Sequence, residues 1–125
     1  MEKFNLVHYP PWYLPVWRLR FSEAIWDNGV ILAWGKKVYC KFTLDNSLIA
    51  HEKVHLKQQR FSYIYGLWWL VKYSFSARFR LLQEIPAHQA EYRLNPNDVV
   101  PQRLASSLYG NLITLRAARK LCRNI

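Results

Sequence analysis

The chain has 125 residues, a length that suits one hydrophobic core, and we expect a single domain over residues 1–125. Hydrophobic residues make up 51% of the sequence and aromatic residues 16%, which excludes a disordered chain. Lys and Arg number 18 against 8 Asp and Glu, and the net charge of +10 predicts attraction to polyanions such as nucleic acid, anionic lipid or an acidic cell-wall polymer.

The N-terminal region lacks the pattern of a secretory signal, because Pro10, Pro15 and Arg18 interrupt the apolar stretch that such a signal requires. The longest strongly apolar run, residues 63–71, is far shorter than the roughly 20 residues that span a membrane. We therefore expect a cytoplasmic protein without a transmembrane segment.

The first third of the chain predicts a small antiparallel sheet at about residues 17–42. Apolar side chains alternate with polar or basic ones over residues 17–21 and again over 38–42, the period of a half-buried strand. Two turn signals, Asp27-Asn28-Gly29 and Gly35-Lys36-Lys37, lie on either side of the apolar residues 30–34.

Helices are expected after the sheet. Residues typical of a helix N-cap occur at 43 and 45–47, and neither Pro nor Gly interrupts residues 48–61. A second helix is expected around the apolar residues 63–73, and a third at roughly residues 81–92.

A fourth helix is expected to begin near Pro101, with leucines on one face at positions 104, 108, 112 and 115. The sequence therefore predicts an α+β fold in which three to four helices follow the small sheet.

One motif dominates the functional argument: His51-Glu52-Lys53-Val54-His55 is an HExxH pattern inside the first predicted helix. Residues four apart share a helix face, with Cβ atoms about 6 Å apart, so both imidazoles can bind one tetrahedral zinc ion. Glu52 can take a proton from the attacking water and pass it to the leaving amine. The alternative is that His51 and His55 are ordinary helix residues, one in the core and one on the surface.

A zinc site of this kind needs a third protein ligand. The extended HExxHxxGxxH pattern is excluded, because the chain has Gln58 and Phe61 at the required positions. On one face of the third predicted helix lie Glu84, His88 and Glu91. We favour Glu84 as the third ligand and His88 as a group that orients a zinc-bound imidazole or stabilises the oxyanion.

Two alternatives remain open for this helix. His88 could be the third ligand with Glu84 supporting it. The acidic residues Glu84 and Glu91 could instead simply neutralise arginines on a basic surface.

Other candidate site groups carry weaker signals. Gln59 lies four residues after His55 and is a candidate for a contact with the metal ligands or the substrate. Tyr92 and Tyr109 are candidates to assist an oxyanion. Trp68 and Trp69 are expected to pack in the core, with a substrate-binding wall as one alternative and interfacial contact with a membrane, helped by the basic surface, as another.

A family resemblance rests on three segments: His51 to Gln59, the aromatic residues 68–73, and Glu84 to Glu91. Together they resemble the minimal metallopeptidase-like proteins of phages and bacterial genomes. The segment Glu84-Ile85-Pro86-Ala87 is also similar to the Glu-x-x-Ala segment of gluzincin metallopeptidases. The similar part runs from about Val38 to Tyr92.

The resemblance implies a reduced zincin-like core and one zinc ion per chain, with His51, His55 and Glu84 as ligands and Glu52 as the general base. The chain departs from many gluzincins at His88, where those proteins have Asp. Pro86 predicts that Glu84 lies in the first turn of its helix, since an interior proline costs about 3 kcal/mol.

Two functions compete at this level. The first is a zinc-dependent metallopeptidase that hydrolyses a peptide or protein substrate, with Glu52 as general base and His88 assisting. The second is a non-catalytic basic binding module on a zincin scaffold, whose partner is nucleic acid or an anionic membrane or cell-wall surface. The sequence contains no nucleic-acid motif of known spacing and leaves the oligomeric state unknown.

Overall fold

The computed structural model describes residues 5–7, 31–40, 44–106 and 109–123. The chain forms two compact units, which we call the first and second unit. The first unit comprises Met1–Thr43 and Leu56–Phe75, and the second comprises Leu44–His55 and Ser76–Ile125. The expectation that residues 1–125 form a single domain stays a prediction.

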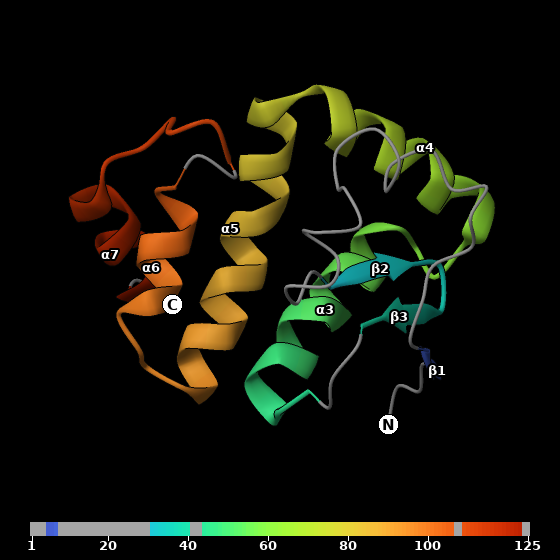
Figure 1. Cartoon of the computed structure of the whole chain (residues 1–125), viewed down its shortest axis with the longest axis horizontal. Helices are drawn as coiled ribbons and strands as arrows, with labels where there is room; N and C mark the ends of the chain where they lie inside the picture. Colours follow the sequence, from blue (N-terminus) through green and yellow to red (C-terminus); the bar gives the residue numbers. More distant parts are fainter. Residues whose placement is uncertain (1–4, 8–30, 41–43, 107–108, 124–125) are drawn as a thin grey trace. The chain divides into compact units, whose positions relative to one another are not determined.

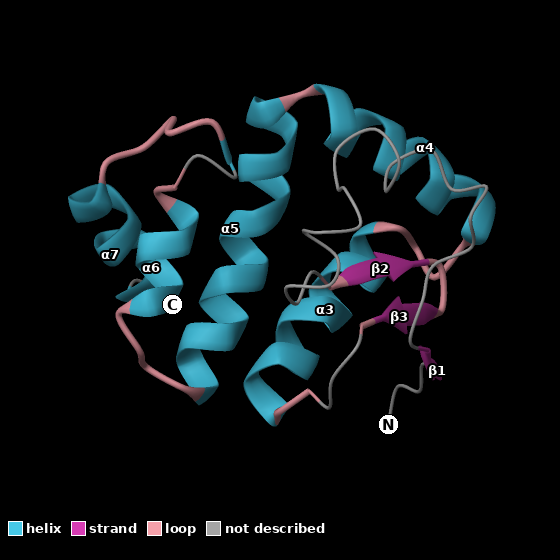
Figure 2. Ribbon diagram, viewed as in Figure 1, coloured by secondary structure: helices cyan, strands magenta, loops and turns pink. Residues whose placement is uncertain are grey.

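The structure confirms the predicted α+β class, with strands early in the chain and helices after them (Figure 2). The strands are β1 (Asn5–Val7), β2 (Leu32–Trp34) and β3 (Lys37–Tyr39). The helices in the described residues are α3 (Asn46–Gln58), α4 (Tyr63–Phe75), α5 (Ala77–Leu94), α6 (Val99–Leu104) and α7 (Leu115–Arg123).

The sheet of the first unit is built on a hairpin. Strands β2 and β3 pair antiparallel, with Trp34 opposite Lys37, as the turn signal at Gly35 predicts. Gly35 has a φ of 63°, a left-handed conformation that glycine adopts without strain in a tight hairpin turn. Strand β1 adds to β3 in parallel, a pairing that the alternation pattern did not indicate. The strand expected at residues 17–21 and the turn at 27–29 lie outside the described residues.

The loop after α3 is fastened to this hairpin by Gln59, whose side chain is fully buried. Its Nε2 donates to the carbonyl of Ala33 at 2.9 Å, and its Oε1 accepts from the backbone N–H of Gly35 at 2.8 Å. A Cβ on Gly66 of α4 would collide with the same Oε1, so this close approach requires glycine. The amide of Gln59 therefore binds the backbone of the hairpin, whereas the sequence suggested a contact with the metal ligands or the substrate.

In the second unit, side-chain caps begin the two long helices. Asp45 accepts a hydrogen bond from the N–H of Leu48 at 2.9 Å at the start of α3, as the N-cap signal predicts. Ser76 accepts one from the N–H of Phe79 at 3.1 Å at the start of α5. Both caps satisfy N–H groups that have no partner within the first turn of a helix.

Helix α5 continues through Pro86, so the prediction that Glu84 lies in a first helical turn is wrong. Glu84 lies well inside the helix, more than one turn after it begins at Ala77. The proline removes the N–H that would bond the carbonyl of Leu82. Both Pro86 and Leu82 are exposed, so water can satisfy that carbonyl and the helix is preserved.

The expected fourth helix is divided into α6 and α7, because a left-handed turn at Gly110 (φ 79°) and Asn111 (φ 51°) separates them. Both short helices pack beside α5 (Figure 1). Their shared core consists of Leu81, Val100, Leu104, Tyr109, Ala118 and Cys122. This core holds the helix that carries the downstream candidate ligands.

Candidate metal centre

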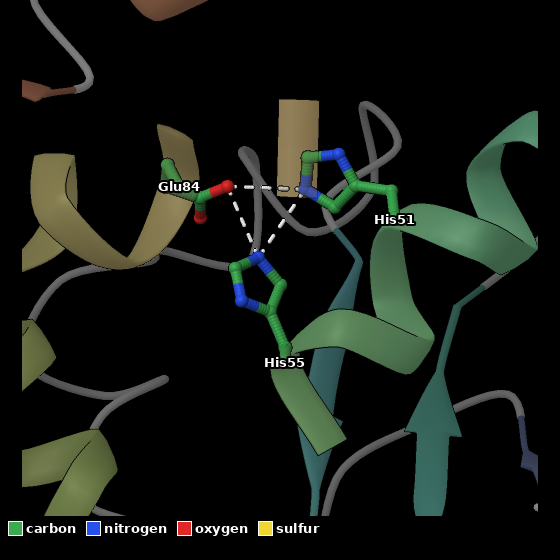
Figure 3. Close-up of side chains that lie close together, drawn as sticks. All are labelled: His51, His55 and Glu84. Carbon is green, nitrogen blue, oxygen red and sulfur yellow. Dashed lines mark hydrogen bonds and ion pairs between the residues drawn. The ribbon is translucent and has the colours of Figure 1, made fainter. Parts of the chain in front are cut away.

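Three buried side chains of the second unit converge on one point: His51 and His55 from α3, and Glu84 from α5 (Figure 3). Oε1 of Glu84 lies 3.0 Å from Nε2 of His51 and 3.0 Å from Nε2 of His55. The two Nε2 atoms are 3.2 Å apart. These three residues could hold a metal ion.

The spacing of these atoms fits zinc. A tetrahedral ion with bonds of about 2.0–2.1 Å keeps its ligand atoms roughly 3.3 Å apart, close to the separations in the triangle. Two imidazole nitrogens and a carboxylate oxygen are also a common zinc donor set.

The side chains of the triangle strongly shift one another's pKa values. Burial opposes charge on His51, yet its hydrogen bonds to Glu84 and Glu91 outweigh burial and raise its pKa to about 10. Burial likewise opposes ionisation of Glu84, but His55 and the other imidazoles hold the pKa of that carboxyl well below its ordinary value. The carboxylate is therefore ionised, as a metal ligand must be.

Glu52 lies beside the triangle, with its Oε2 3.8 Å from Nε2 of His51. The side chain is buried, and burial is the main reason that its pKa is raised. A carboxyl group with a raised pKa beside a potential metal position suits a general base, whose efficiency increases as its pKa approaches the working pH.

Glu91, to which the sequence assigned no defined role, supports His51 through the ring nitrogen that points away from the triangle. Nδ1 of His51 donates to Oε1 of Glu91 at 2.8 Å, and Oε2 of Glu91 accepts from a terminal nitrogen of Arg103 at 2.5 Å. Such a carboxylate fixes the tautomer and orientation of a metal-binding imidazole and directs Nε2 toward the ion. The available signal was the i+7 spacing of Glu91 from Glu84; nothing local indicated Arg103.

His88 is completely buried but does not belong to the triangle. Its Nδ1 donates to the backbone carbonyl of Glu84 at 2.8 Å and lies 3.4 Å from Oε1 of the same residue. Burial lowers the pKa of His88, so the ring is neutral and Nε2 is an acceptor; among the described residues it has no hydrogen-bond partner. In the structure, Glu91 rather than His88 bonds the outer nitrogen of His51. The predicted role of His88 at an oxyanion stays a prediction.

The two tyrosine candidates lie in or beside the core of the second unit. The ring of Tyr109 meets that of His88 edge to face, with centroids 5.5 Å apart, and Tyr92 packs against the same core. Their predicted assistance to an oxyanion stays a prediction.

The alternative that treats the motif residues as ordinary helix positions predicts one exposed histidine. His51 is 5% exposed and His55 is 4% exposed, so both are buried. Glu84 is 3% exposed and contacts both imidazoles. It is therefore not a surface residue that only neutralises nearby arginines.

Comparisons of the chain with protein-family models, with curated proteins and with solved structures found no match. Among the described residues, no helix has the length and apolar character needed to cross a membrane.

Proposed function

We propose that the second unit is a zinc-dependent peptidase centre in which His51, His55 and Glu84 bind one zinc ion per chain. The observation that carries the proposal is the convergence of these three ligand atoms with the carboxylate of Glu52 beside them. Three protein ligands leave a coordination position for water or substrate, the arrangement of catalytic rather than structural zinc sites. The gluzincin resemblance of the sequence supports the same assignment.

Zinc bound there would supply Lewis acidity, which polarises a carbonyl and makes water more acidic. Glu52 would accept the proton of the water that attacks the peptide carbonyl carbon. When the C–N bond breaks, the water oxygen stays on that carbon and Glu52 passes the proton to the amine nitrogen. Glu91 keeps His51 oriented throughout, because its other oxygen is held by Arg103.

The decisive experiment combines metal content with a single-atom change at Glu52. The full chain is purified without chelator, its zinc is measured by mass spectrometry, and hydrolysis of a fluorogenic peptide library is followed. We expect about one zinc per chain in both the parent protein and Glu52→Gln, and hydrolysis that falls by at least about a hundredfold in the variant.

Lys53→Gln is the matched control, since it changes the neighbouring charge on the same helix and should retain both zinc and hydrolysis. A protein that takes up no zinc would overturn the proposal, as would hydrolysis that survives in Glu52→Gln. A metal-free protein that still binds anionic polymers would favour the basic binding module instead.

A further inference from the structure

Helix α4 carries large apolar side chains that are exposed in the described part of the first unit. Ile64 is 87% exposed, Phe75 68% and Trp68 57%, so the expectation that Trp68 packs in the core is wrong. Positions 64, 68 and 75 are separated by four and seven residues, so these side chains share one face of the helix. The opposite face is buried through Trp69 and Leu70.

A helix at the surface of a soluble protein ordinarily places polar residues opposite its buried face. In α4 both faces are apolar, and burial against the described residues of the first unit explains only one of them. A contiguous exposed apolar face of this kind marks a surface that contacts another molecule or a membrane.

The charges around this face define its partner. Lys72 places its Nζ 5.3 Å from the ring centroid of Trp68, and the guanidinium of Arg60 lies 4.7 Å from the ring centroid of Tyr65. The residues of the first unit that the structure describes include no Asp or Glu; their basic members are Lys36, Lys37, Lys57, Arg60 and Lys72. An apolar face bordered by aromatic rings and cations is complementary to a surface that is apolar inside and negatively charged outside.

We propose that the outer face of α4 docks on an anionic lipid membrane, with the helix lying in the plane of the interface. Its 13 residues extend about 20 Å, short of the roughly 30 Å of bilayer hydrocarbon, so the helix rests in the headgroup region. Ile64, Trp68 and Phe75 enter the acyl boundary, and Lys72 reaches back to the phosphates. This function is separate from the peptidase proposal, because none of these residues belongs to the second unit.

The test is co-sedimentation of the full chain with vesicles of phosphatidylcholine alone and of phosphatidylcholine mixed with phosphatidylglycerol. We expect binding to the mixed vesicles only. The double variant Ile64→Ser/Phe75→Ser should weaken that binding at least about tenfold. Lys72→Gln should weaken it about fivefold, with a smaller effect at high salt.

The matched control is Leu94→Ser/Leu112→Ser, which removes two comparably exposed apolar side chains from the second unit and should leave binding unchanged. Circular dichroism checks that each variant is folded. Equal binding by the α4 variant and the parent protein would overturn the proposal, and so would no binding to mixed vesicles. A dimer in light scattering that dissociates in the α4 variant, without vesicle binding, would assign the face to a second copy and also overturn it.

Discussion

Nδ1 of His51 donates a hydrogen bond to the carboxylate of Glu91, at 2.8 Å. Glu91 lies two helical turns beyond Glu84 on α5, so one helix supplies both a candidate ligand and the group that orients another. The carboxylate of Glu91 is itself anchored by the guanidinium of Arg103.

Glu91→Ala should lower zinc affinity by about 10–100-fold while all three ligands remain, because His51 loses the acceptor that orients it. Isothermal titration with zinc in a buffered solution measures the change. Arg93→Ala, at an exposed position of the same helix, is the control and should bind zinc as the parent protein does. Unchanged affinity in Glu91→Ala would show that His51 is positioned without this carboxylate.

Zinc should stabilise the fold, since the ligand triangle exists only in the folded chain. A free zinc concentration of 100 times the dissociation constant adds about 2.7 kcal/mol to the free energy of unfolding. Thermal unfolding followed by circular dichroism should show a higher midpoint with zinc than with chelator. In His55→Ala the two midpoints should coincide; a shift that persists there would place the stabilising ion elsewhere.

Gln59→Leu should destabilise the first unit by about 1–3 kcal/mol, because the buried N–H of Gly35 and carbonyl of Ala33 both lose their side-chain partner. Urea unfolding measures the loss. Lys57→Leu introduces the same side chain at an exposed position nearby and should change the free energy of unfolding by less than about 0.5 kcal/mol. Equal effects of the two substitutions would contradict the bonding role of Gln59.

The exposed pair of Asp98 and Arg119 gives a pH dependence in acid. Hydrogen bonds from Arg119 and Gln102 lower the pKa of Asp98 from 3.8 to about 2. A carboxyl group whose pKa is depressed on folding contributes stability above its ordinary pKa, and that contribution is lost as the pH falls toward 2.

Unfolding midpoints between pH 2 and pH 6 should therefore fall less steeply in Asp98→Asn than in the parent protein. Arg119→Gln should flatten the same region, and the double variant should add little to either single change. Independent, additive effects would show that the two side chains do not act as a pair. High salt should reduce the difference, because the pair is exposed.

Local signals carried much of the prediction. The cap at Asp45, the uninterrupted run after it and the i, i+4 spacing of His51 and His55 depend only on neighbouring residues, so the sequence was sufficient to place them. The turn at Gly35 was predictable for the same reason. Glu84 could be chosen as a candidate ligand because few acidic residues follow the motif.

The predictions that proved wrong depended on features that the local sequence pattern does not contain, such as solvent exposure and contacts between distant residues. An interior proline destabilises a helix through its missing N–H and the crowding of its ring against the carbonyl four residues earlier, but Pro86 and Leu82 are exposed, so water can satisfy that carbonyl and lessen the cost. Leucine spacing alone predicted one helix where Gly110 and Asn111 turn the chain. The contacts of Glu91 with Arg103 and of Gln59 with the hairpin join residues distant in sequence, which no local pattern encodes.

The contact of Glu91 with Arg103 means that the residues supporting the candidate metal centre extend beyond the segment that carries the candidate ligands. The stretch that resembles metallopeptidases stops near Tyr92 and contains every candidate ligand, so motif inspection alone would draw the boundary there. Arg103 belongs to α6, which packs with α7 against α5 in the core of the second unit. A fragment trimmed after Tyr92 would retain the three candidate ligands and Glu91 but lose Arg103, which holds the Glu91 carboxylate, so the contacts that support the candidate centre extend into α6.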